Sequence, residues 1–420
     1  MALEMSKDSE FAVHPKLEEV FVDLSRSSVH WLLFRGEERL NRPTGDIDLL
    51  VSLSDKRRAD GILCGHGFVR LGTGTLIDRV AYVFYHVDTK VWLKIDLVTR
   101  VSFGVALEFD TSLADSFLEC RVESGPLFLP SRDDAFWHLL VHYMLDKGGI
   151  PEPWRETLRL RSTHTSSTSS LERFLRSIGA DTDLIVNAVS QGDWSYVEEE
   201  FQRIRRVWWR AQAVGVRRRF AAQKILQRVG LGTWTSFRPG FVVAILGPDG
   251  AGKSTLSARL REGMEMPCRD VYMGLWKKGL PERIAGRIPG VETIFMLLRL
   301  ITRQIRLSYY RWRGKVVVLD RYTTDALLVS PTDSWKQRAT SGLVAMLSRS
   351  PDLYLVLDLP GEVAFSRKGE EDVETLERWR QTYRSLSYGD VPVKFIDATL
   401  TAEEVASIAL STVWEHAQRR

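Results

Sequence analysis

A glycine-rich stretch near the middle of the sequence has the residue types of a phosphate-binding loop. Residues 244–255 read AILGPDGAGKST, and Gly247, Gly252 and Lys253 fit the spacing G-x-x-x-x-G-K-[ST]. Glycines let consecutive backbone N–H groups point inward around phosphate oxygens, and a helix that starts after them adds the positive end of its dipole. The stretch therefore predicts a site for a polyphosphate.

The expected ligand of this loop is ATP, as a cosubstrate, together with Mg²⁺. We expect the Lys253 ammonium group to reach the terminal phosphates and the Ser254 hydroxyl to hold Mg²⁺. The residues expected to bind the nucleotide are Gly247, Asp249, Gly250, Ala251, Gly252, Lys253, Ser254 and Thr255. The loop itself does not identify the molecule that accepts the phosphoryl group.

Two later segments are expected to lie near this loop. The run 315–328, KVVVLDRYTTDALL, is a buried-type strand that ends in Asp320 and Arg321. At the carboxyl end of a strand, Asp320 is expected to orient a magnesium-bound water and Arg321 to bind an acceptor phosphate. Arg367 and Lys368 lie where a lid could close over the phosphates; a solvated helix face is the alternative interpretation.

These pieces together resemble the thymidylate kinase family of P-loop nucleoside monophosphate kinases. The resemblance rests on GPDGAGKST, on DRY at 320–322 and on the LDLP…RK…YRSL segment, and it runs from Phe241 to the C-terminus. It implies phosphoryl transfer that depends on ATP and Mg²⁺, with Arg367 neutralising charge in the transition state. It also implies that Asp249 faces the acceptor sugar and that the protein forms a homodimer.

The sequence departs from that family where the acceptor is recognised. The family's Phe-Arg motif is absent, and residues 269–290, RDVYMGLWKKGLPERIAGRIPG, stand in its place. We therefore expect a small-molecule acceptor that is a nucleotide, a phosphorylated sugar or another hydroxylated molecule.

A second group of candidate residues is acidic and lies in the first hundred residues. Asp46 and Asp48, two apart in DIDLLVSL (46–53), project from one face of a strand, and Asp96 lies within VWLKIDLV (91–98). Three carboxylates that converge from two strands would form a site for Mg²⁺. The alternative is that Asp46 caps a turn and Asp96 lies at the surface.

This half resembles the nucleotidyltransferase fold of the DNA polymerase beta type, through GDIDLLV after the Arg35-Gly36 step. The resemblance implies that Asp46, Asp48 and Asp96 are metal ligands and that Gly36 lies against the triphosphate. The broader fold carries Gly-Ser or Gly-Gly at the position of Arg35-Gly36. Either nucleotidyl transfer is retained with an altered grip on the triphosphate, or the domain binds without turnover.

Histidines and basic helices complete the candidates. His138 and His142 have the i,i+4 spacing of a metal pair, but we expect packing residues because no third ligand is apparent. Residues 203–228 and 296–313 interleave Arg with aromatic residues. We expect an interdomain helix whose arginines cover apolar surface; peripheral membrane contact is the second interpretation, and nucleic acid is unlikely.

The periodicity of the apolar residues divides the chain into three parts. Residues 1–130 are expected to form a nucleotidyltransferase-like α+β domain and 131–237 a helical extension, with an exposed Ser/Thr-rich loop at 162–170. Residues 238–420, with strand-like runs at 241–246, 316–319, 353–358 and 392–396, are expected to form a doubly wound parallel sheet with helices on both faces. The expected fold class is therefore α/β multidomain.

Composition limits the remaining possibilities. Apolar residues make up 44% of the 420 residues, charged residues make up 27%, and three distant cysteines favour the cytoplasm. We expect a fusion of two enzymes, a kinase and a nucleotidyltransferase. In one alternative the nucleotidyltransferase is the main activity and the kinase supplies its substrate; in the others the N-terminal half is a binding module, or the protein is an NTP-binding switch.

Overall fold

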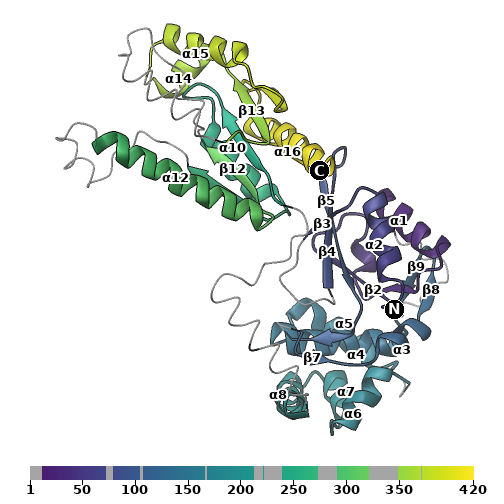
Figure 1. Ribbon diagram of the computed structural model, residues 1–420. Coiled ribbons are helices and arrows are strands. Elements are labelled where there is room, and N and C mark those ends of the chain that lie inside the picture. Colours follow the sequence, from purple (N-terminus) through teal and green to yellow (C-terminus); the bar gives the residue numbers. More distant parts are fainter. Residues whose placement is uncertain are drawn as a thin grey trace. The chain divides into compact units, whose positions relative to one another are not determined.

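The computed structural model describes residues 12–71, 79–104, 107–165, 168–211, 221, 239–272, 291–320, 349–369 and 371–420. Its chain divides into two compact units (Figure 1). Unit 1 comprises Met1–His86 and Val91–Trp234, and unit 2 comprises Val87–Lys90 and Thr235–Arg420. Each unit has its own central sheet, and each is described separately below.

Unit 1 is built on a five-stranded mixed sheet in the order β1-β2-β5-β4-β3. The strands are β1 (Trp31–Leu33), β2 (Asp46–Val51), β3 (Val69–Leu71), β4 (Arg79–His86) and β5 (Val91–Val98). Only the β2–β5 pair is parallel, and its register places Asp48 beside Asp96. The strands expected in 46–53, 79–87 and 91–98 are therefore confirmed.

Helices α1 (Pro15–Arg26) and α2 (Lys56–Gly65) pack on this sheet through their apolar sides. Leu17, Val20, Phe21 and Leu24 recur at helical spacing in α1 and are fully buried against strand residues such as Leu49. The sequence pattern thus places the apolar stripe of α1 in the core. Burying it removes apolar surface from water, which is the main stabilising term for such a layer.

The helical part of unit 1 shares a core with the sheet. Its elements are β6 (Ser102–Phe103), β7 (Phe109–Asp110), α3 (Ala114–Glu119), β8 (Val122–Ser124), β9 (Leu127–Leu129), α4 (Arg132–His142), the π-helix η2 (Tyr143–Lys147), α5 (Glu152–Ser162), α6 (Ser170–Ser177), α7 (Thr182–Gln191) and α8 (Trp194–Ala211). A short 3-10 helix, η1, covers Glu37–Arg39. Leu32 and Leu50 of the sheet contribute to the same buried cluster as Trp137 and Trp208 of these helices.

The Ser/Thr-rich segment 162–170 connects α5 to α6 and exposes Thr163, His164 and Thr168, as expected for a loop, but its two ends are buried. Ser162 ends α5, Ser169 caps α6, and both are buried, as is Ser170. The hydroxyl groups of Ser169 and Ser170 and the Ser170 N–H donate to Asp134 at 2.7, 3.3 and 3.1 Å. A buried acceptor on another helix therefore gives these polar residues the partners that the local sequence does not supply.

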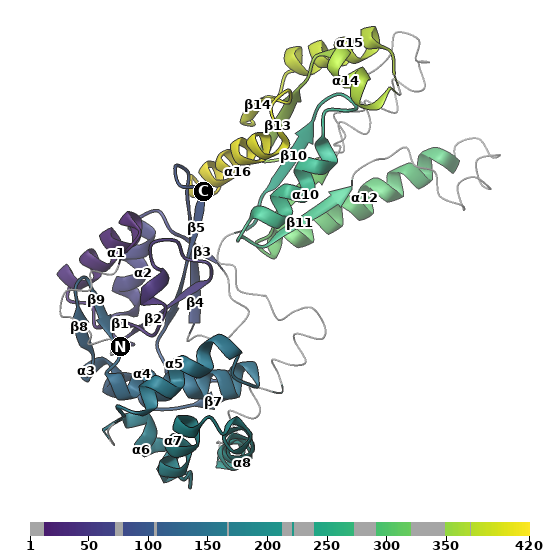
Figure 2. The same cartoon turned by 180° about the vertical axis from the view of Figure 1, so that it is seen from behind.

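Unit 2 is a five-stranded parallel sheet in the order β11-β12-β10-β13-β14. The strands are β10 (Val242–Leu246), β11 (Cys268–Tyr272), β12 (Val316–Asp320), β13 (Leu353–Asp358) and β14 (Val393–Asp397). Helices α10 (Lys253–Gly263) and α16 (Ala402–Gln418) contact each other on one side of the sheet. On the other side, α12 (Val291–Trp312) and α15 (Val373–Ser385) contribute Leu307 and Tyr383 to one cluster with the strands (Figures 1 and 2).

This architecture confirms the expected parallel α/β fold for the second half of the chain. Four of the five strands match the apolar runs in the sequence, and β10, β12 and β13, which are covered on both faces, are continuously hydrophobic. The fifth strand, β11, was not expected because CRDVY is short, carries two charges and lies at the edge of the sheet. No helix in the part of the chain that the structure describes is long and apolar enough to cross a membrane.

We expect Asp134→Ala to destabilise unit 1 by about 3 kcal/mol, because it leaves buried donors of Ser169 and Ser170 without their acceptor. Denaturant unfolding followed by circular dichroism measures this change. Asp183→Ala is the control, since this carboxylate is three-quarters exposed at the start of α7 and pairs with Arg176. Equal stability of the two variants would contradict the structural role given to Asp134.

Candidate functional site

The phosphate loop lies between β10 and α10, as expected from the sequence. All five residues of β10 are buried, so the loop starts from a fixed point in the core. Gly247, Gly250 and Gly252 have φ angles of 146°, 87° and 90°, which side chains with a Cβ rarely adopt. A Cβ on Gly250 would also lie 2.7 Å from the carbonyl oxygen of Ala364, so the loop packs against the backbone of α14 (Gly361–Lys368).

The side chain of Lys253, the first residue of α10, folds back over the loop that precedes the helix. Lys253 is 8% exposed, and its Nζ donates to the carbonyl oxygens of Gly247 at 2.7 Å and Pro248 at 2.9 Å. It also pairs with the Asp249 carboxylate at 3.2 Å, and Lys368 of α14 lies 4.0 Å from the same carboxylate. The ammonium group is therefore placed over the loop, where bound phosphates would exchange with these oxygen acceptors.

The remaining loop residues are Ala251, which precedes α10, and Ser254 and Thr255 in its first turn. Ala251 is buried, whereas the side chains of Ser254 and Thr255 are exposed. A hydroxyl at this position suits Mg²⁺, which prefers oxygen ligands and takes several of them from water and nucleotide phosphates. The donor set of the loop thus fits the expected magnesium nucleotide, and Ser254 stays the predicted ligand from the protein.

The carboxyl ends of three strands meet beside the loop. Asp320, the last residue of β12, is paired with Ile245 of β10, and Val356 of β13 is paired with Leu246. The register therefore places the backbone of Asp320 at the edge from which the loop leaves. Arg321, the expected ligand of the acceptor phosphate, lies outside the described residues.

Arg367 and Lys368 differ in where their side chains lie. The guanidinium group of Arg367 donates to the carbonyl oxygen of Ala398 at 3.0 Å, at the end of β14. Lys368 is the neighbour that approaches the loop, through Asp249. The transition-state role expected for Arg367 stays a prediction, and it requires the side chain to leave Ala398.

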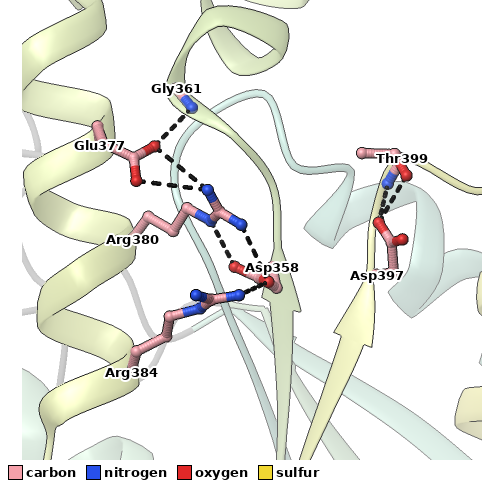
Figure 3. Close-up of polar contacts among 7 residues, drawn as sticks. All are labelled: Asp358, Gly361, Glu377, Arg380, Arg384, Asp397 and Thr399. Atoms are coloured by element: carbon pink, nitrogen blue, oxygen red, sulfur yellow. Dashed lines mark hydrogen bonds and ion pairs between the residues drawn. The ribbon is translucent and has the colours of Figure 1, made fainter.

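Sequence reasoning missed a charged cluster at the carboxyl end of β13 (Figure 3). Asp358 accepts hydrogen bonds from Arg380 Nε at 2.6 Å and from Arg384 at 2.5 Å. The bond from Arg380, followed by that from Arg384, lowers the pKa of Asp358 below its usual value. The signal in the sequence is the i,i+4 pair of arginines in α15, whose carboxylate partner lies on another element.

The three acidic residues of unit 1 converge as the strand spacing predicts. Their shared neighbour is Arg79 of β4, whose guanidinium group lies 3.7 Å from both Asp46 and Asp48 and also bonds to Asp96. Lys94 pairs with Asp46 at 2.8 Å. Arg35 pairs with Asp48 at 3.1 Å, and Gly36 next to it has a φ of 90°.

Asp96 is the buried member of this cluster, at 2% exposed, so it does not lie at the surface. Burial raises the pKa of Asp96 above its usual value, and the charge of Arg79 opposes that change. Among the described residues, no group of three or more His, Cys, Asp and Glu has an arrangement that could hold a metal ion. The carboxylates are arranged around a guanidinium group rather than around an open cation site.

His138 lies in the core of unit 1, as expected for a packing residue. It stacks on Phe34 with ring centroids 4.3 Å apart, and burial holds its pKa well below the usual value. His142, one turn later, pairs instead with Asp146 at 2.5 Å. The two histidines therefore have different partners and different surroundings.

The two basic helices also differ. In α8, Trp208 is buried in the core of unit 1 and Arg203 pairs with Glu200, so as far as residue 211 this helix packs within unit 1; the interdomain packing expected for 203–228 stays a prediction. In α12 an exposed apolar stripe follows helical spacing; its members are Leu298, Ile301, Ile305, Tyr309 and Trp312. Membrane contact and a homodimer both stay predictions for this helix.

No family model matches the chain. Among curated proteins, the thymidylate kinase of Xylella fastidiosa (strain M12) is 33% identical over 194 residues, covering 42% of this chain and 88% of that protein. The thymidylate kinase of Xanthomonas campestris pv. campestris (strain B100) is 30% identical over 196 residues, covering 41% and 83%. A solved structure of deoxyadenosine kinase from M. mycoides with bound dATP covers 41% of this chain and 98% of its own, at 20% identity and a TM-score of 0.30.

The similarity to the Xylella protein extends over most of that kinase, and it accompanies a phosphate loop with the spacing and the strand-loop-helix setting described above. The chain belongs to the thymidylate kinase family.

Proposed function

We propose that unit 2 is a nucleotide kinase that transfers the terminal phosphoryl group of ATP to a small acceptor, with a nucleoside monophosphate as the first candidate. The observation that carries this proposal is the loop from Gly247 to Thr255, which places Lys253 between a buried strand and a helix N-terminus. The similarity to bacterial thymidylate kinases supports the same activity.

The proposed chemistry divides the work among a few side chains. Lys253 and the loop N–H groups hold the β- and γ-phosphates, and Ser254 would hold a magnesium ion, which would neutralise phosphate charge. Asp249 faces the acceptor, and the Asp320 carboxylate would orient the acceptor or a water at the magnesium site. Arg321 binds the acceptor phosphate, and Arg367 stabilises the transferred group after leaving Ala398.

The identity of the acceptor is not proposed, because residues 269–290 stand in place of the Phe-Arg motif with which the family recognises its acceptor. Deoxynucleoside and nucleoside monophosphates, phosphorylated sugars and other hydroxylated molecules are therefore all included in the test. We also propose that the enzyme is soluble and cytoplasmic and that it forms a homodimer.

We expect Lys253→Ala to lower kcat/KM for phosphoryl transfer by at least about 100-fold, because it removes the ammonium group that stabilises transferred charge. The measurement is ATP consumption by the full chain with Mg²⁺ and each acceptor in turn. Product analysis by mass spectrometry identifies the acceptor.

Lys315→Ala is the matched control, since this lysine follows α12 and its ammonium group lies over the Tyr310 ring. Two results would contradict the proposal: ATP turnover that is equal in all three proteins, and hydrolysis to ADP that no acceptor in the panel increases. The second result would favour the alternative of an NTP-binding switch.

For unit 1 we propose a binding module rather than a second enzyme. The observation that favours it is Arg79, which lies among Asp46, Asp48 and Asp96 where a nucleotidyltransferase would need metal-bound oxygens. A guanidinium group neutralises these carboxylates without supplying the Lewis acid that nucleotidyl transfer requires. The competing proposal is an active nucleotidyltransferase in which Arg79 moves aside and the three carboxylates bind Mg²⁺.

We expect the double variant Asp46→Asn/Asp48→Asn to keep the phosphoryl-transfer activity of the full chain.

We also expect Arg79→Gln to destabilise unit 1 by about 3 kcal/mol, because it leaves the buried Asp96 carboxylate without its counter-charge. Denaturant unfolding measures the second effect, with Arg100→Gln as the control because its pair with Asp110 is more exposed.

Incubation of the wild-type chain with α-labelled nucleoside triphosphates and Mg²⁺ or Mn²⁺ separates the two proposals for unit 1. A labelled nucleotidyl product that disappears in the Asp46→Asn/Asp48→Asn variant would overturn the binding module and restore the second enzyme.

A further inference from the structure

The N-terminus of α14 is capped by a side chain from the following helix. Its N-cap residue, Pro360, provides no side-chain hydrogen bond, so the first N–H groups of the helix need another acceptor. The Gly361 N–H donates to Glu377 of α15 at 3.0 Å. A Cβ on Gly361 would lie 2.7 Å from the Val373 carbonyl oxygen, so α14 and α15 approach each other closely at this point.

Arg380 links this cap to the sheet. Its guanidinium group lies 3.3 Å from Glu377 and donates to both oxygens of Asp358, at 2.6 Å from Nε and 3.3 Å from the second nitrogen (Figure 3). Asp358 is the last residue of β13, two residues after Val356, the last residue of β13 that pairs with β10. A two-bond contact of this kind fixes orientation as well as distance.

About one turn beyond Gly361, the backbone of α14 lies against the phosphate loop. A Cβ on Gly250 would lie 2.7 Å from the Ala364 carbonyl oxygen, and a Cβ on Gly247 would lie 2.8 Å from the Leu357 carbonyl oxygen. Leu357 precedes Asp358, so the contacts form a closed ring from the loop through β13, α15 and α14 back to the loop. Each contact involves backbone or a partly buried polar side chain, so a shift in one member is expected to move the next.

We propose that Glu377 and Arg380 are positioning residues for nucleotide binding: they hold α14 against Gly250 and thereby keep the phosphate loop in its binding conformation. The inference rests on the proposed kinase function of unit 2. Glu377 acts on the α14 backbone at Gly361, and Arg380 acts through Glu377 and Asp358.

α15 carries two arginines that serve as controls. Arg384 is half exposed and donates to the same Asp358 carboxylate as Arg380. Arg380 contacts Glu377 as well as Asp358. Arg378 is exposed on the same helix. If the contact with Glu377 is what matters, Arg384→Gln and Arg378→Gln must have much smaller effects than Arg380→Gln.

The experiment measures the affinity of the full chain for MgATP by isothermal titration calorimetry, together with the melting temperature of each variant without nucleotide. We expect Arg380→Gln and Glu377→Gln to weaken MgATP binding roughly tenfold or more, because misplacing binding groups by about 1 Å has effects of this order. Arg380→Lys should recover part of the affinity, and the double variant Glu377→Gln/Arg380→Gln should be less than additive because both act in one ring.

The outcomes separate this proposal from the proposed function. Folded Arg380→Gln and Glu377→Gln variants that bind MgATP as tightly as the Arg378→Gln control would overturn the positioning role and leave the kinase proposal intact. A lowered melting temperature with unchanged affinity would show a purely structural role and overturn it as well. If Arg380→Gln does not fold, the nearly isosteric Glu377→Gln decides. Absence of MgATP binding in the wild-type chain would overturn the kinase proposal itself.

Discussion

Parallel hydrogen bonding in the sheet of unit 2 is the constraint on which its candidate site depends. Because β10, β12 and β13 run in the same direction and in fixed register, the residues after Leu246, the residue Asp320 and the residue Asp358 lie at one edge. The phosphate loop leaves from the central strand of the three, so it is supported on both sides. The chemistry proposed for this unit therefore depends on strand register before it depends on any particular side chain.

Unit 1 uses a similar alignment for a different electrostatic arrangement. The parallel pairing of β2 with β5 brings Asp48 beside Asp96, and β4 supplies Arg79 from the next position in the sheet. Three carboxylates in one place repel each other, so a positive partner is required for them to coexist in a partly buried site. Here that partner is a side chain of the chain itself. In both units, strand pairing therefore brings the charged residues together. In unit 1 the carboxylates surround an arginine of the same chain, whereas in unit 2 Lys253 is proposed to bind the phosphates of a ligand.

The predictable part of the structure consists of the features that local sequence determines. Buried strands such as β10 and β13 appear as continuous apolar runs, and the phosphate loop appears through glycine spacing followed by Lys253. The convergence of Asp46, Asp48 and Asp96 was also predictable, because alternation along strands sets which residues share a face. Edge strand β11 was not, since CRDVY is a short run that carries two charged residues.

The features that sequence reasoning missed depend on pairs of residues far apart in the chain. Asp358 and Arg380 are 22 positions apart, and Ser169 and Asp134 are 35 positions apart. The periodicity of one helix or strand does not predict such a pair, because the two residues meet only when separate elements pack together. Arg79 was missed for the same reason: its position beside the carboxylates follows from the antiparallel pairing of β4 with β5.

The internal bonds of Lys253 bear on which anions the loop can discriminate. Its ammonium group already has three oxygen acceptors, two of them backbone carbonyls. An incoming anion must replace those acceptors, so a ligand that offers only one or two oxygens in reach gains little net free energy. Longer chains of linked phosphates offer more oxygens together with more negative charge. The three internal acceptors therefore favour ligands that bring several oxygens to the ammonium group at once.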